Sequence, residues 1–451
     1  MKYEEYKQVN IGWVNEIPMN WDVIPIKYTV SNPALSFIDG DWIESKVIEA
    51  DGIRYLTTGN VGALSYKEQG TGFISEKTFA EINCTEVFPG DILISRLNEP
   101  IARACIVPDL GYRIVVAVDN VIYRPISQLY DRRFVMYQMN CFPYAENASF
   151  IARGSTMPRI SRTMLGAIKL CIPPLPVQQV IADYLDVKCG EINRAIDVQR
   201  KKIDLLNELK QTVITDAVTK GLNPNAPMKN SGVEWIGEVP EHWEVRKLKY
   251  LCRQEKYSIK TGPFGSQLKG EDLKEEGDVR VYNQRNVLDN NFEDTKYFVT
   301  SNKAKLLKSF YTLPNDILLT SRGTIGKAAL LPKGKIMGLL HPCLIAIRIN
   351  KCIINPHYLL YYINEFKGFN TAIQLASNST TIEVIYTDTI KNVLITLPSI
   401  QEQQAIVAHI EKEVSKIDTQ ISKANRKIEL LDELKQSIIT EAVTGKIKVF
   451  N

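Results

Sequence analysis

The chain has 451 residues, of which 45% are hydrophobic and 24% are charged, and its formal net charge is +4. This length is sufficient for several domains with buried cores. No segment approaches the roughly 18 uninterrupted apolar residues of a membrane-spanning helix, and the opening MKYEEYKQVN lacks the apolar region of a signal peptide, so we expect a cytoplasmic protein. The charge alone does not indicate nucleic-acid binding, which would require cations concentrated on one face.

Residues that could support catalysis are not arranged for it. The eight cysteines and four histidines are dispersed, without a CxxC pair, so we expect reduced buried thiols and no metal site. A methyltransferase would need an Asn/Asp-Pro-Pro-aromatic motif, but the nearest match, Asn355–Tyr358, lacks the second proline and fits a helix start. GTIGKAAL, at 323–330, lacks the spacing of a phosphate-binding loop. The sequence therefore predicts no catalytic residue and no cofactor.

The first predicted part is a leader with a globular domain, over residues 1–172. A strand is indicated within Val115–Ile126 and a helix over Phe134–Asn140. Polar residues follow strand-like segments, and their hydroxyl, amide and guanidinium groups suit contacts with bases and phosphates. The candidate DNA-binding residues here are Thr57, Thr58, Asn60, Arg96, Arg153, Ser155, Thr156 and Arg159. Ordinary explanations stay open for each loop: a polar turn, a salt bridge at a strand end, or a helix cap.

A long helix is predicted over residues 173–222. Prolines stand at its start, at 173, 174 and 176, and none recurs until Pro224. A narrow seam of coiled-coil type follows a spacing of three and four residues, through Leu185, Cys189, Ile192, Ile196, Gln199, Ile203 and Leu206. About 40 helical residues span roughly 60 Å. The candidate partner-binding residues are Lys202, Glu208, Lys210 and Gln211, although a solvated helix face is the usual role of such residues.

The second half follows the same order. A linker and second leader are predicted over residues 223–242, a globular domain over 243–396 and a second long helix over 397–451. In the domain, Leu344–Ile349 is predicted as a strand and His357–Glu365 as a helix. Its candidate DNA-binding residues are Asn283, Gln284, Arg285, Asn286, Arg322, Lys327, Asn378, Ser379, Thr380 and Thr381. On the helix, the candidate partner-binding residues are Lys427, Glu433, Lys435 and Gln436.

The two halves are an internal repeat. Aligned without a gap, residues 172–222 and 397–447 are identical at roughly 19 of about 51 positions. The second helix also repeats the seam, through Ile410, Val414, Ile417, Ile421, Ala424, Ile428 and Leu431. A stripe this narrow requires a partner, and two matching stripes favour pairing of the two helices over packing of each on its own domain. A two-fold relation between the repeats would make that pair antiparallel, so the fold class predicted is two α+β domains in tandem with an antiparallel coiled coil and pseudo-two-fold symmetry.

Several motifs follow one another along the chain. They are the leader SGVEWIGEVPEHWEVRKLK, GPFGSQLK at 262–269, an N/G-D-I-L segment followed by S-R and GTIGKAAL, and an LP-x-x-x-x-Q-Q entry to a helix ending in ELKQ-x-x-I-T-x-A-V-T. In this order they resemble the specificity subunit of type I restriction-modification systems, and the resemblance covers essentially the whole chain. It implies a non-catalytic subunit that reads a bipartite double-stranded DNA target through two target-recognition domains. It also implies docking of two modification (methyltransferase) subunits and of restriction (motor-nuclease) subunits.

The first half departs from this pattern. NEPIARACIV stands in place of GTIG, GPFGS has no clean counterpart near Pro33–Gly40, and Val177 stands where the second copy has Glu402. Divergent domains predict two different half-sites and hence an asymmetric, gapped target. The helices would set the gap, so one added heptad in either should lengthen it. Two alternatives stay open: a methyltransferase or restriction enzyme with its own recognition domains, and a coiled-coil scaffold that binds only protein.

Overall fold

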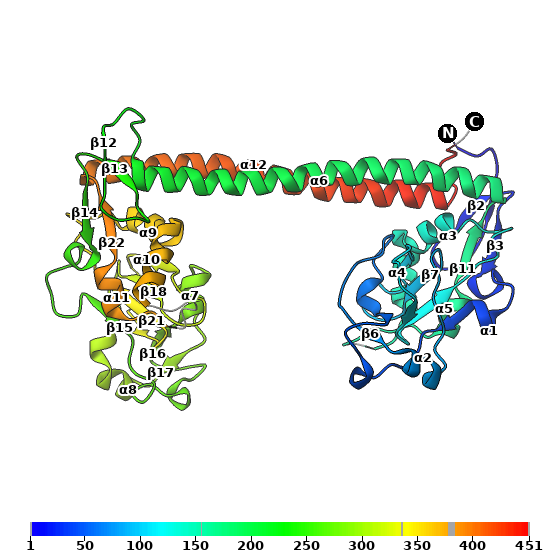
Figure 1. The fold of residues 1–451 in the computed structure, drawn as a ribbon, viewed down its shortest axis with the longest axis horizontal. Helices are drawn as coiled ribbons and strands as arrows, with labels where there is room; N and C mark the ends of the chain where they lie inside the picture. The colour runs from blue at the N-terminus through cyan, green and yellow to red at the C-terminus, as the bar shows by residue number, and fades with distance from the viewer. Residues whose placement is uncertain (1, 155, 335–336, 378–383, 450–451) are drawn as a thin grey trace. The chain divides into compact units, whose positions relative to one another are not determined.

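A computed structural model describes residues 2–154, 156–334, 337–377 and 384–449 (Figure 1). The chain divides into two compact units, which we call unit 1 (residues 1–200 and 425–451) and unit 2 (residues 201–424). Each unit holds an α+β domain and one half of each of two long helices. Within the described ranges, no helix combines the length and apolar character needed to cross a membrane.

The domain of unit 1 is built from short strands and five helices. Its strands are β1 (Tyr6–Gln8), β2 (Glu16–Pro18), β3 (Asp22–Pro25), β4 (Phe37–Asp39), β5 (Ile53–Leu56), β6 (Phe73–Ile74), β7 (Ile92–Ser95), β8 (Ala104–Ile106), β9 (Ile114–Val116), β10 (Asn120–Tyr123) and β11 (Lys169–Ile172). Its helices are α1 (Pro33–Ser36), α2 (Glu76–Ile82), α3 (Arg132–Met139), α4 (Phe142–Ile151) and α5 (Arg162–Ala167).

The domain of unit 2 repeats this order. Its strands are β12 (Met228–Asn230), β13 (Glu238–Pro240), β14 (Glu244–Lys247), β15 (Ile259–Thr261), β16 (Val279–Tyr282), β17 (Phe298–Val299), β18 (Ile317–Thr320), β19 (Ala328–Leu330), β20 (Leu339–Leu340), β21 (Leu344–Ile347) and β22 (Leu394–Leu397). Its helices are α7 (Gln284–Leu288), α8 (Ser301–Leu306), α9 (Pro356–Asn364), α10 (Lys367–Ser377) and α11 (Thr387–Asn392).

The two domains share one sheet topology. A four-stranded antiparallel sheet has the order β4-β10-β7-β8 in unit 1 and β15-β21-β18-β19 in unit 2. A three-stranded sheet has the order β6-β5-β9 and β17-β16-β20, and its last two strands are parallel in both units. The predicted α+β class is confirmed. The predicted strand within Val115–Ile126 is instead two strands, because the chain turns at Ala117, whose carbonyl accepts from Asn120 N–H at 2.9 Å.

The two long helices are α6 (Leu175–Lys220) and α12 (Ile400–Val443). Each is anchored at its start by a fully buried glutamine. Gln178 accepts from Asp131 N–H at 2.9 Å and donates to the Leu129 and Pro173 carbonyls. Gln403 makes the same three kinds of contact, with Asn355, Ile353 and Pro398. The Gln-Gln repeated after proline in the sequence therefore fixes each helix to its own domain.

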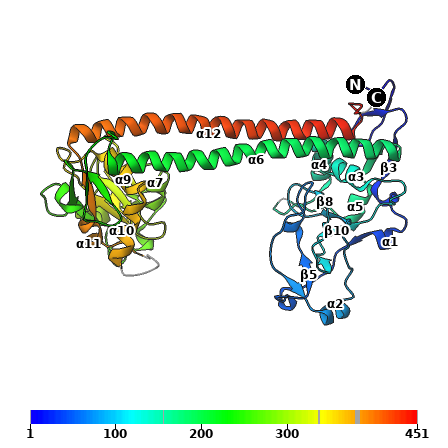
Figure 2. The same cartoon turned by 45° about the horizontal axis from the view of Figure 1, so that its top comes forward.

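The helices run antiparallel within each unit (Figure 2). In unit 1 the early part of α6 packs with the end of α12, since Leu185 and Cys189 share a core with Ile439 and Val443. In unit 2 the end of α6 packs with the start of α12. Lys210 Nζ lies 2.8 Å from Asp418 Oδ1 there, and the equivalent contact in unit 1 joins Lys435 to Asn193 at 3.1 Å. The predicted antiparallel pairing is confirmed.

The buried tryptophans of the two leaders have different neighbours. Trp243 donates its indole N–H to Glu402 Oε1 at 2.9 Å, and His242 also contacts that carboxylate. Trp21 occupies the equivalent position in unit 1, but Val177 replaces the glutamate there. Its ring packs edge-on against Tyr3, with centroids 5.9 Å apart. The leader of unit 1 thus covers its tryptophan with an aromatic neighbour in place of a carboxylate.

We expect Glu402→Val to lower the free energy of unfolding by about 1–3 kcal/mol, because it leaves the buried Trp243 N–H without its acceptor. The measurement is calorimetric unfolding of the whole chain. Gln404→Val, at an exposed position of the same helical turn, controls for the poorer helix propensity of valine. Equal destabilisation by the two substitutions would show that the carboxylate contributes nothing.

Candidate nucleic-acid interface

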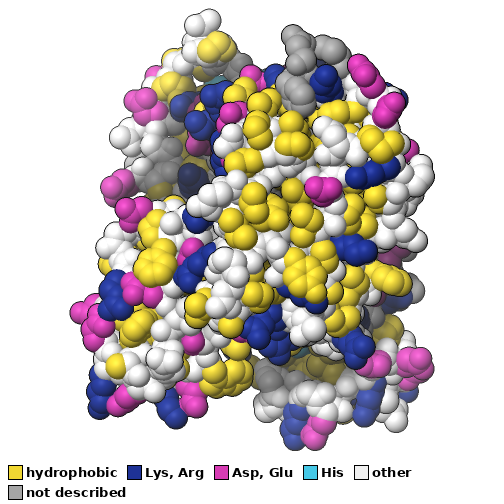
Figure 3. Space-filling model, turned by 90° about the vertical axis from the view of Figure 1, so that its right-hand side faces the viewer, with side chains coloured by type: hydrophobic (Ala, Val, Ile, Leu, Met, Phe, Trp, Pro, Cys, Tyr) yellow, Lys and Arg dark blue, Asp and Glu magenta, His cyan; other side chains and the backbone are white. Residues whose placement is uncertain are grey.

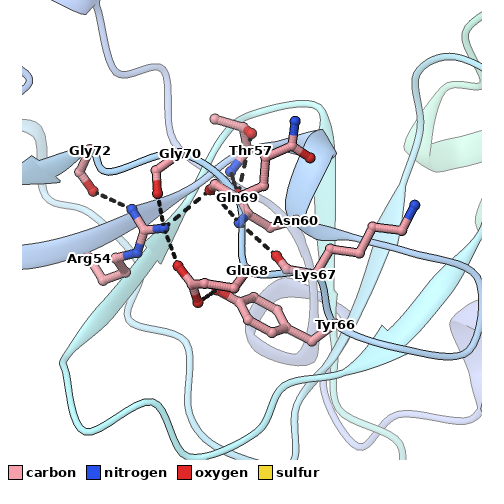
Figure 4. A network of polar contacts seen from close by, with 9 residues as sticks. All are labelled: Arg54, Thr57, Asn60, Tyr66, Lys67, Glu68, Gln69, Gly70 and Gly72. Carbon is pink, nitrogen blue, oxygen red and sulfur yellow. Dashed lines mark hydrogen bonds and ion pairs between the residues drawn. The ribbon is translucent and has the colours of Figure 1, made fainter. Parts of the chain in front are cut away.

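The first polar loop, residues 57–60, is a short 3₁₀ turn held by a dense hydrogen-bond network (Figure 4). Asn60 Oδ1 accepts from Thr57 N–H at 2.9 Å, and its amide donates to the Lys67 and Gln69 carbonyls at 3.0 and 2.8 Å. Arg54, buried beneath, donates to Glu68 Oε1 at 2.8 Å and to the Gly70 carbonyl at 2.7 Å. The loop is therefore rigid and tied to residues 66–72.

The neighbouring tyrosine closes this network. Tyr66 donates its hydroxyl to Glu68 Oε2 at 2.7 Å. Burial, together with that hydrogen bond, raises the pKa of Tyr66 to about 12. The hydroxyl therefore stays protonated and acts as a donor at physiological pH.

The equivalent loop in unit 2 has the same architecture. Asn283 caps α7, accepting from Arg285 N–H at 2.8 Å, and Asn286 Oδ1 accepts from Asn283 N–H at 3.0 Å. The Asn286 amide donates to the Asn291 and Asp294 carbonyls, both at 2.9 Å. Arg280 occupies the position of Arg54 and donates to the Phe292 carbonyl at 3.3 Å. The similarity of TTGN and NQRN thus reflects one shared loop structure.

This architecture corrects part of the predicted site. Asn60 and Asn286 are 1% and 3% exposed, and both ends of each amide are used inside the protein. Their role is to hold the loop, so neither side chain faces DNA. The side chains that remain at the loop surface are Thr57, Thr58, Gln284 and Arg285, and Gln284 also donates to the Thr324 carbonyl at 3.1 Å. The Arg285 side chain is 81% exposed and pairs with Asp289 at 3.1 Å.

The two arginines after β7 and β18 have different environments. Arg96 is 5% exposed; it donates to the Val118 carbonyl at 2.6 Å, and its Nε lies 3.1 Å from Asp39 Oδ1. The prediction of a DNA contact at Arg96 is wrong, because the guanidinium is committed to this buried strand-end ion pair. Arg322 is exposed, because it lies one residue further along the chain than the counterpart of Arg96. That counterpart is the buried Ser321, since Arg96 N–H donates to the Asp119 carbonyl and Ser321 N–H to the Cys343 carbonyl, each just before an equivalent strand. Arg322 stays a candidate.

Arg153 and Arg159 form an isolated antiparallel bridge in unit 1. Arg153 and Arg159 exchange backbone hydrogen bonds at 3.0 and 2.9 Å, and Arg153, Thr156 and Arg159 are exposed. Arg159 pairs with Asp119 Oδ1 at 2.7 Å. Lys327, in unit 2, is exposed and donates to the Asn364 carbonyl at 3.1 Å. The predicted residues Ser155, Asn378, Ser379, Thr380 and Thr381 lie outside the described residues.

The predicted partner-binding residues of the helices have different environments. Lys202, Glu208, Lys427 and Glu433 are exposed. Lys210 and Lys435 instead bridge to the neighbouring helix, and Gln211 donates to the Glu365 carbonyl of its own unit. All three are half-buried, and a partner-facing role for them stays a prediction. Gln436 Oε1 is buried without a hydrogen-bond partner, beside a cavity of about 480 Å³ lined by residues including Phe142 and Arg103.

Another repeated surface feature lies in the leaders. Lys27 Nζ stands over the exposed Tyr28 ring at 4.9 Å, and Lys249 stands over Tyr250 at 5.1 Å. Figure 3 views the end of unit 1 on which β3 and α1 lie, and shows apolar side chains interspersed with Lys and Arg. The exposed apolar residues of these elements and their flanks are Met19, Tyr28 and Leu35. A surface of this mixed type suits protein contact better than phosphate contact.

Sequence reasoning missed the counterpart of GPFGSQLK in unit 1. Gly40 N–H donates to the Asn120 carbonyl at 2.9 Å, just as Gly262 N–H donates to the Leu344 carbonyl at 2.9 Å, and both acceptors are the first residues of β10 and β21. Two residues beyond each glycine stands an aromatic side chain, Trp42 or Phe264. The sequences GDWI and GPFG share only the glycine, so their equivalence is apparent only from strand pairing.

A family model for the type I restriction modification DNA specificity domain matches residues 37–203 and 240–431. This chain belongs to that family. The matches fall in both halves, as the repeat requires. Among the residues that the structure describes, His, Cys, Asp and Glu side chains nowhere gather in threes as metal ligands would.

Individual relatives of this specificity-domain chain carry names from the same family. The type I restriction enzyme MjaVIII specificity subunit of Methanocaldococcus jannaschii is 26% identical over 356 residues, covering 76% of each chain. The type I restriction enzyme EcoKI specificity subunit of Escherichia coli is 23% identical, covering 67% of this chain and 63% of that one. A solved chain from a type I R-M system matches with a TM-score of 0.67 at 14% identity, covering 96% of this chain and 99% of that one, which shows a shared fold.

Proposed function

We propose that this specificity-domain chain is the DNA-recognition subunit of a type I restriction-modification complex, and that each unit recognises one half of a gapped, asymmetric DNA target. The observation that carries the proposal is that the two domains have one topology but different loop-tip residues. Residues 1–172 and 243–396 are the recognition parts, 173–222 and 397–451 are the helices, and 223–242 is the linker with the second leader.

The loop tips supply two different sets of recognition groups. In unit 2, Arg285 offers a guanidinium for guanine and Gln284 an amide for adenine. In unit 1, Thr57 and Thr58 offer hydroxyl groups, which pair with either kind of base edge. Exposed cations nearby, Arg153, Arg159, Arg322 and Lys327, contact phosphates and fix the register on the duplex. Different chemistry in the two units accounts for two different half-sites.

The chain itself is non-catalytic in this proposal. Adenine methylation and ATP-dependent cleavage belong to the modification and restriction subunits that it docks, in the cytoplasm where the chromosome lies. Two modification subunits bind, one to each repeat, through surfaces that occur twice. These surfaces are the exposed helix residues Lys202 and Glu208 with Lys427 and Glu433, and the Lys27–Tyr28 pair with Lys249–Tyr250.

The decisive test is the adenine methylome of cells with and without this gene, determined by single-molecule sequencing. We expect methylation of one asymmetric, gapped motif to disappear on deletion and to return when the gene is restored. A motif that stays methylated without the gene would refute the proposal. If no such motif exists in either strain, co-purification of a methyltransferase with the tagged chain decides whether the system is merely inactive.

For the loop of unit 2, we expect Arg285→Ala to weaken binding of the target duplex by about 1–3 kcal/mol and to relax specificity in one half-site only. The measurement is competition binding by the assembled methyltransferase complex, using duplexes altered one base pair at a time. Arg246→Ala removes an equal charge from a strand of the same unit and serves as the control. Relaxed specificity in both half-sites would contradict the assignment of one half-site to each unit.

For the partner surface, we expect Tyr28→Ala and Tyr250→Ala each to reduce the number of bound modification subunits from two to one. The reason is that each ring and its lysine form one of two equivalent exposed contacts. Native mass spectrometry of the purified complex gives the stoichiometry directly. Tyr112→Ala, another exposed aromatic, is expected to retain two copies.

A further inference from the structure

Each unit presents one large aromatic side chain at the tip of an equivalent loop. Trp42, after β4, is 72% exposed, and Phe264, after β15, is 79% exposed. Scattered exposed apolar residues are normal in soluble proteins. Here, however, the same position carries a large flat ring in two domains whose loop sequences otherwise differ. The repetition indicates a role at the surface.

Both loops approach the adjoining strand at a glycine. A Cβ atom at Gly40 would lie closer than 3.0 Å to the Ala117 carbonyl oxygen, and one at Gly262 closer than 3.0 Å to that of His341. Ala117 and His341 are themselves equivalent, because each follows the parallel partner strand, β9 or β20. This close approach sets the position of the ring two residues later.

The same strand end places each ring beside a polar loop. Ala117 N–H donates to the Leu56 carbonyl at 2.8 Å, and Leu56 precedes Thr57. His341 N–H donates to the Tyr282 carbonyl at 2.9 Å, and Tyr282 precedes Asn283. In both units, therefore, a single strand separates the aromatic loop from the loop that carries the proposed base contacts.

The loops are anchored on their far side as well. Ile43 and Ile48 pack on a small core of unit 1, and Leu268 is buried in a core of unit 2. The Phe264 carbonyl accepts from Gln267 N–H at 2.8 Å, and the Gln267 side chain accepts from Phe264 N–H at 3.1 Å. Each ring thus projects from a loop held at both ends, so little conformational freedom is lost when it binds.

Cations accompany both rings. Arg162 Nε lies 3.5 Å from Asp39 Oδ2, at the end of β4 just before Gly40. In unit 2 the exposed cation is Arg322. The residue before it, Ser321, donates its N–H to the Cys343 carbonyl, and Cys343 lies two residues after His341, the residue that Gly262 approaches. A flat apolar ring beside guanidinium groups and hydrogen-bonding loops matches nucleic acid, which offers stacked bases next to phosphates.

We propose that Trp42 and Phe264 are DNA wedges, one for each half-site, whose rings enter a base step beside the bases contacted by the polar loops. This inference rests on the proposed function. The ring partly unstacks the step and bends the duplex, so specificity extends to the deformability of a step that no polar side chain touches. Flexible pyrimidine–purine steps are the expected positions.

The test uses the assembled complex with its methyltransferase subunits and the duplex identified by the methylome. We expect Trp42→Ala and Phe264→Ala each to weaken target binding about tenfold or more, and Trp42→Phe and Phe264→Trp to retain most of it. Tyr112→Ala, at the opposite end of β9, and Leu306→Ala, exposed on α8, are the matched controls and should bind normally.

A spectroscopic readout separates insertion from a structural role. Trp13, Trp21 and Trp243 are buried and Trp235 is half-buried, so the difference in emission between wild type and Trp42→Phe reports mainly on Trp42. We expect target DNA to quench this emission, and to quench the added signal of Phe264→Trp. Because both conservative variants retain a ring, this measurement applies even if an alanine variant fails to fold.

The outcomes separate the wedge from the proposed function. If both alanine variants bind target DNA with unchanged affinity, or if target DNA does not alter the emission, the wedge proposal is wrong. The proposal that the chain recognises DNA is not affected by either result. If the alanine variants lose a methyltransferase subunit but bind DNA normally, the rings serve in protein docking, and the wedge proposal is again wrong. If the wild-type complex does not prefer the target duplex, the proposed function fails together with the inference.

Discussion

Inserting one heptad into each long helix, after Arg200 in α6 and after Ala424 in α12, should lengthen the gap of the methylated motif by about three base pairs. Seven helical residues add about 10.5 Å, and a base pair occupies about 3.4 Å. Whole heptads keep the apolar seam aligned, so Ile196 and Ile417 retain partners of the same kind. Sequencing the methylome of cells carrying the altered gene gives the new motif.

Methylation of the longer motif should also be weaker. Three base pairs turn one half-site by about a third of a helical turn about the DNA axis, and the complex must twist to follow. Inserting four residues at the same two points is the control, because a four-residue insertion disrupts the seam and should abolish methylation. A gap that keeps its original length after the heptad insertions would exclude the helices as spacers.

Gly262→Ala should abolish recognition of one half-site and lower the free energy of unfolding by about 1–3 kcal/mol or more. The added methyl group meets the His341 carbonyl, which belongs to the backbone and cannot move without disturbing the strand pair behind it. The same displacement would carry both Phe264 and the loop starting at Asn283 away from their positions. The measurements are thermal unfolding and the methylome of the variant strain.

The matched control lies three residues along the same loop. A Cβ at Gly265 meets no other atom within 4 Å, so Gly265→Ala should leave stability and methylation nearly unchanged. Gly40→Ala should repeat the Gly262 result for the other half-site, because its Cβ meets the Val116 and Ala117 carbonyls. Normal methylation by Gly262→Ala would contradict the fixed position of the loop.

The features predictable from the sequence are those written into repeated or periodic patterns. The seam from Leu185 to Leu206 and its copy are periodic, so the two stripes can bury each other, and the two-fold relation of the repeats makes the pair antiparallel. The helix at Pro356 was predictable because Asn355 is a strong N-cap, and its side chain does accept from His357 N–H at 2.8 Å. Burial of apolar side chains at helical spacing determines the first pattern, and local hydrogen bonding determines the second.

The site was harder to predict because the same residue types serve structure and recognition. Arg96 and Arg322 both follow equivalent strands, but Arg96 is the first residue after its strand and Arg322 the second, and this offset leaves Arg96 paired with Asp39 and Arg322 exposed. Asn60 and Asn286 repeat because they hold their loops, which makes repetition a poor guide to DNA contact here. Trp42 and Phe264 become equivalent only through the pairing of Gly40 and Gly262 with other strands.

The division of each long helix between the units has a consequence for folding during synthesis. The domain of unit 1 leaves the ribosome first, but Leu185 and Cys189 pack against Ile439 and Val443, close to the end of the chain. All of residues 201–424 are made before that partner exists. Unit 2 is continuous in sequence and can complete its core earlier. Unit 1, which is translated first, therefore completes its folding after unit 2. Until then, the part of α6 that belongs to unit 1 has an exposed apolar stripe.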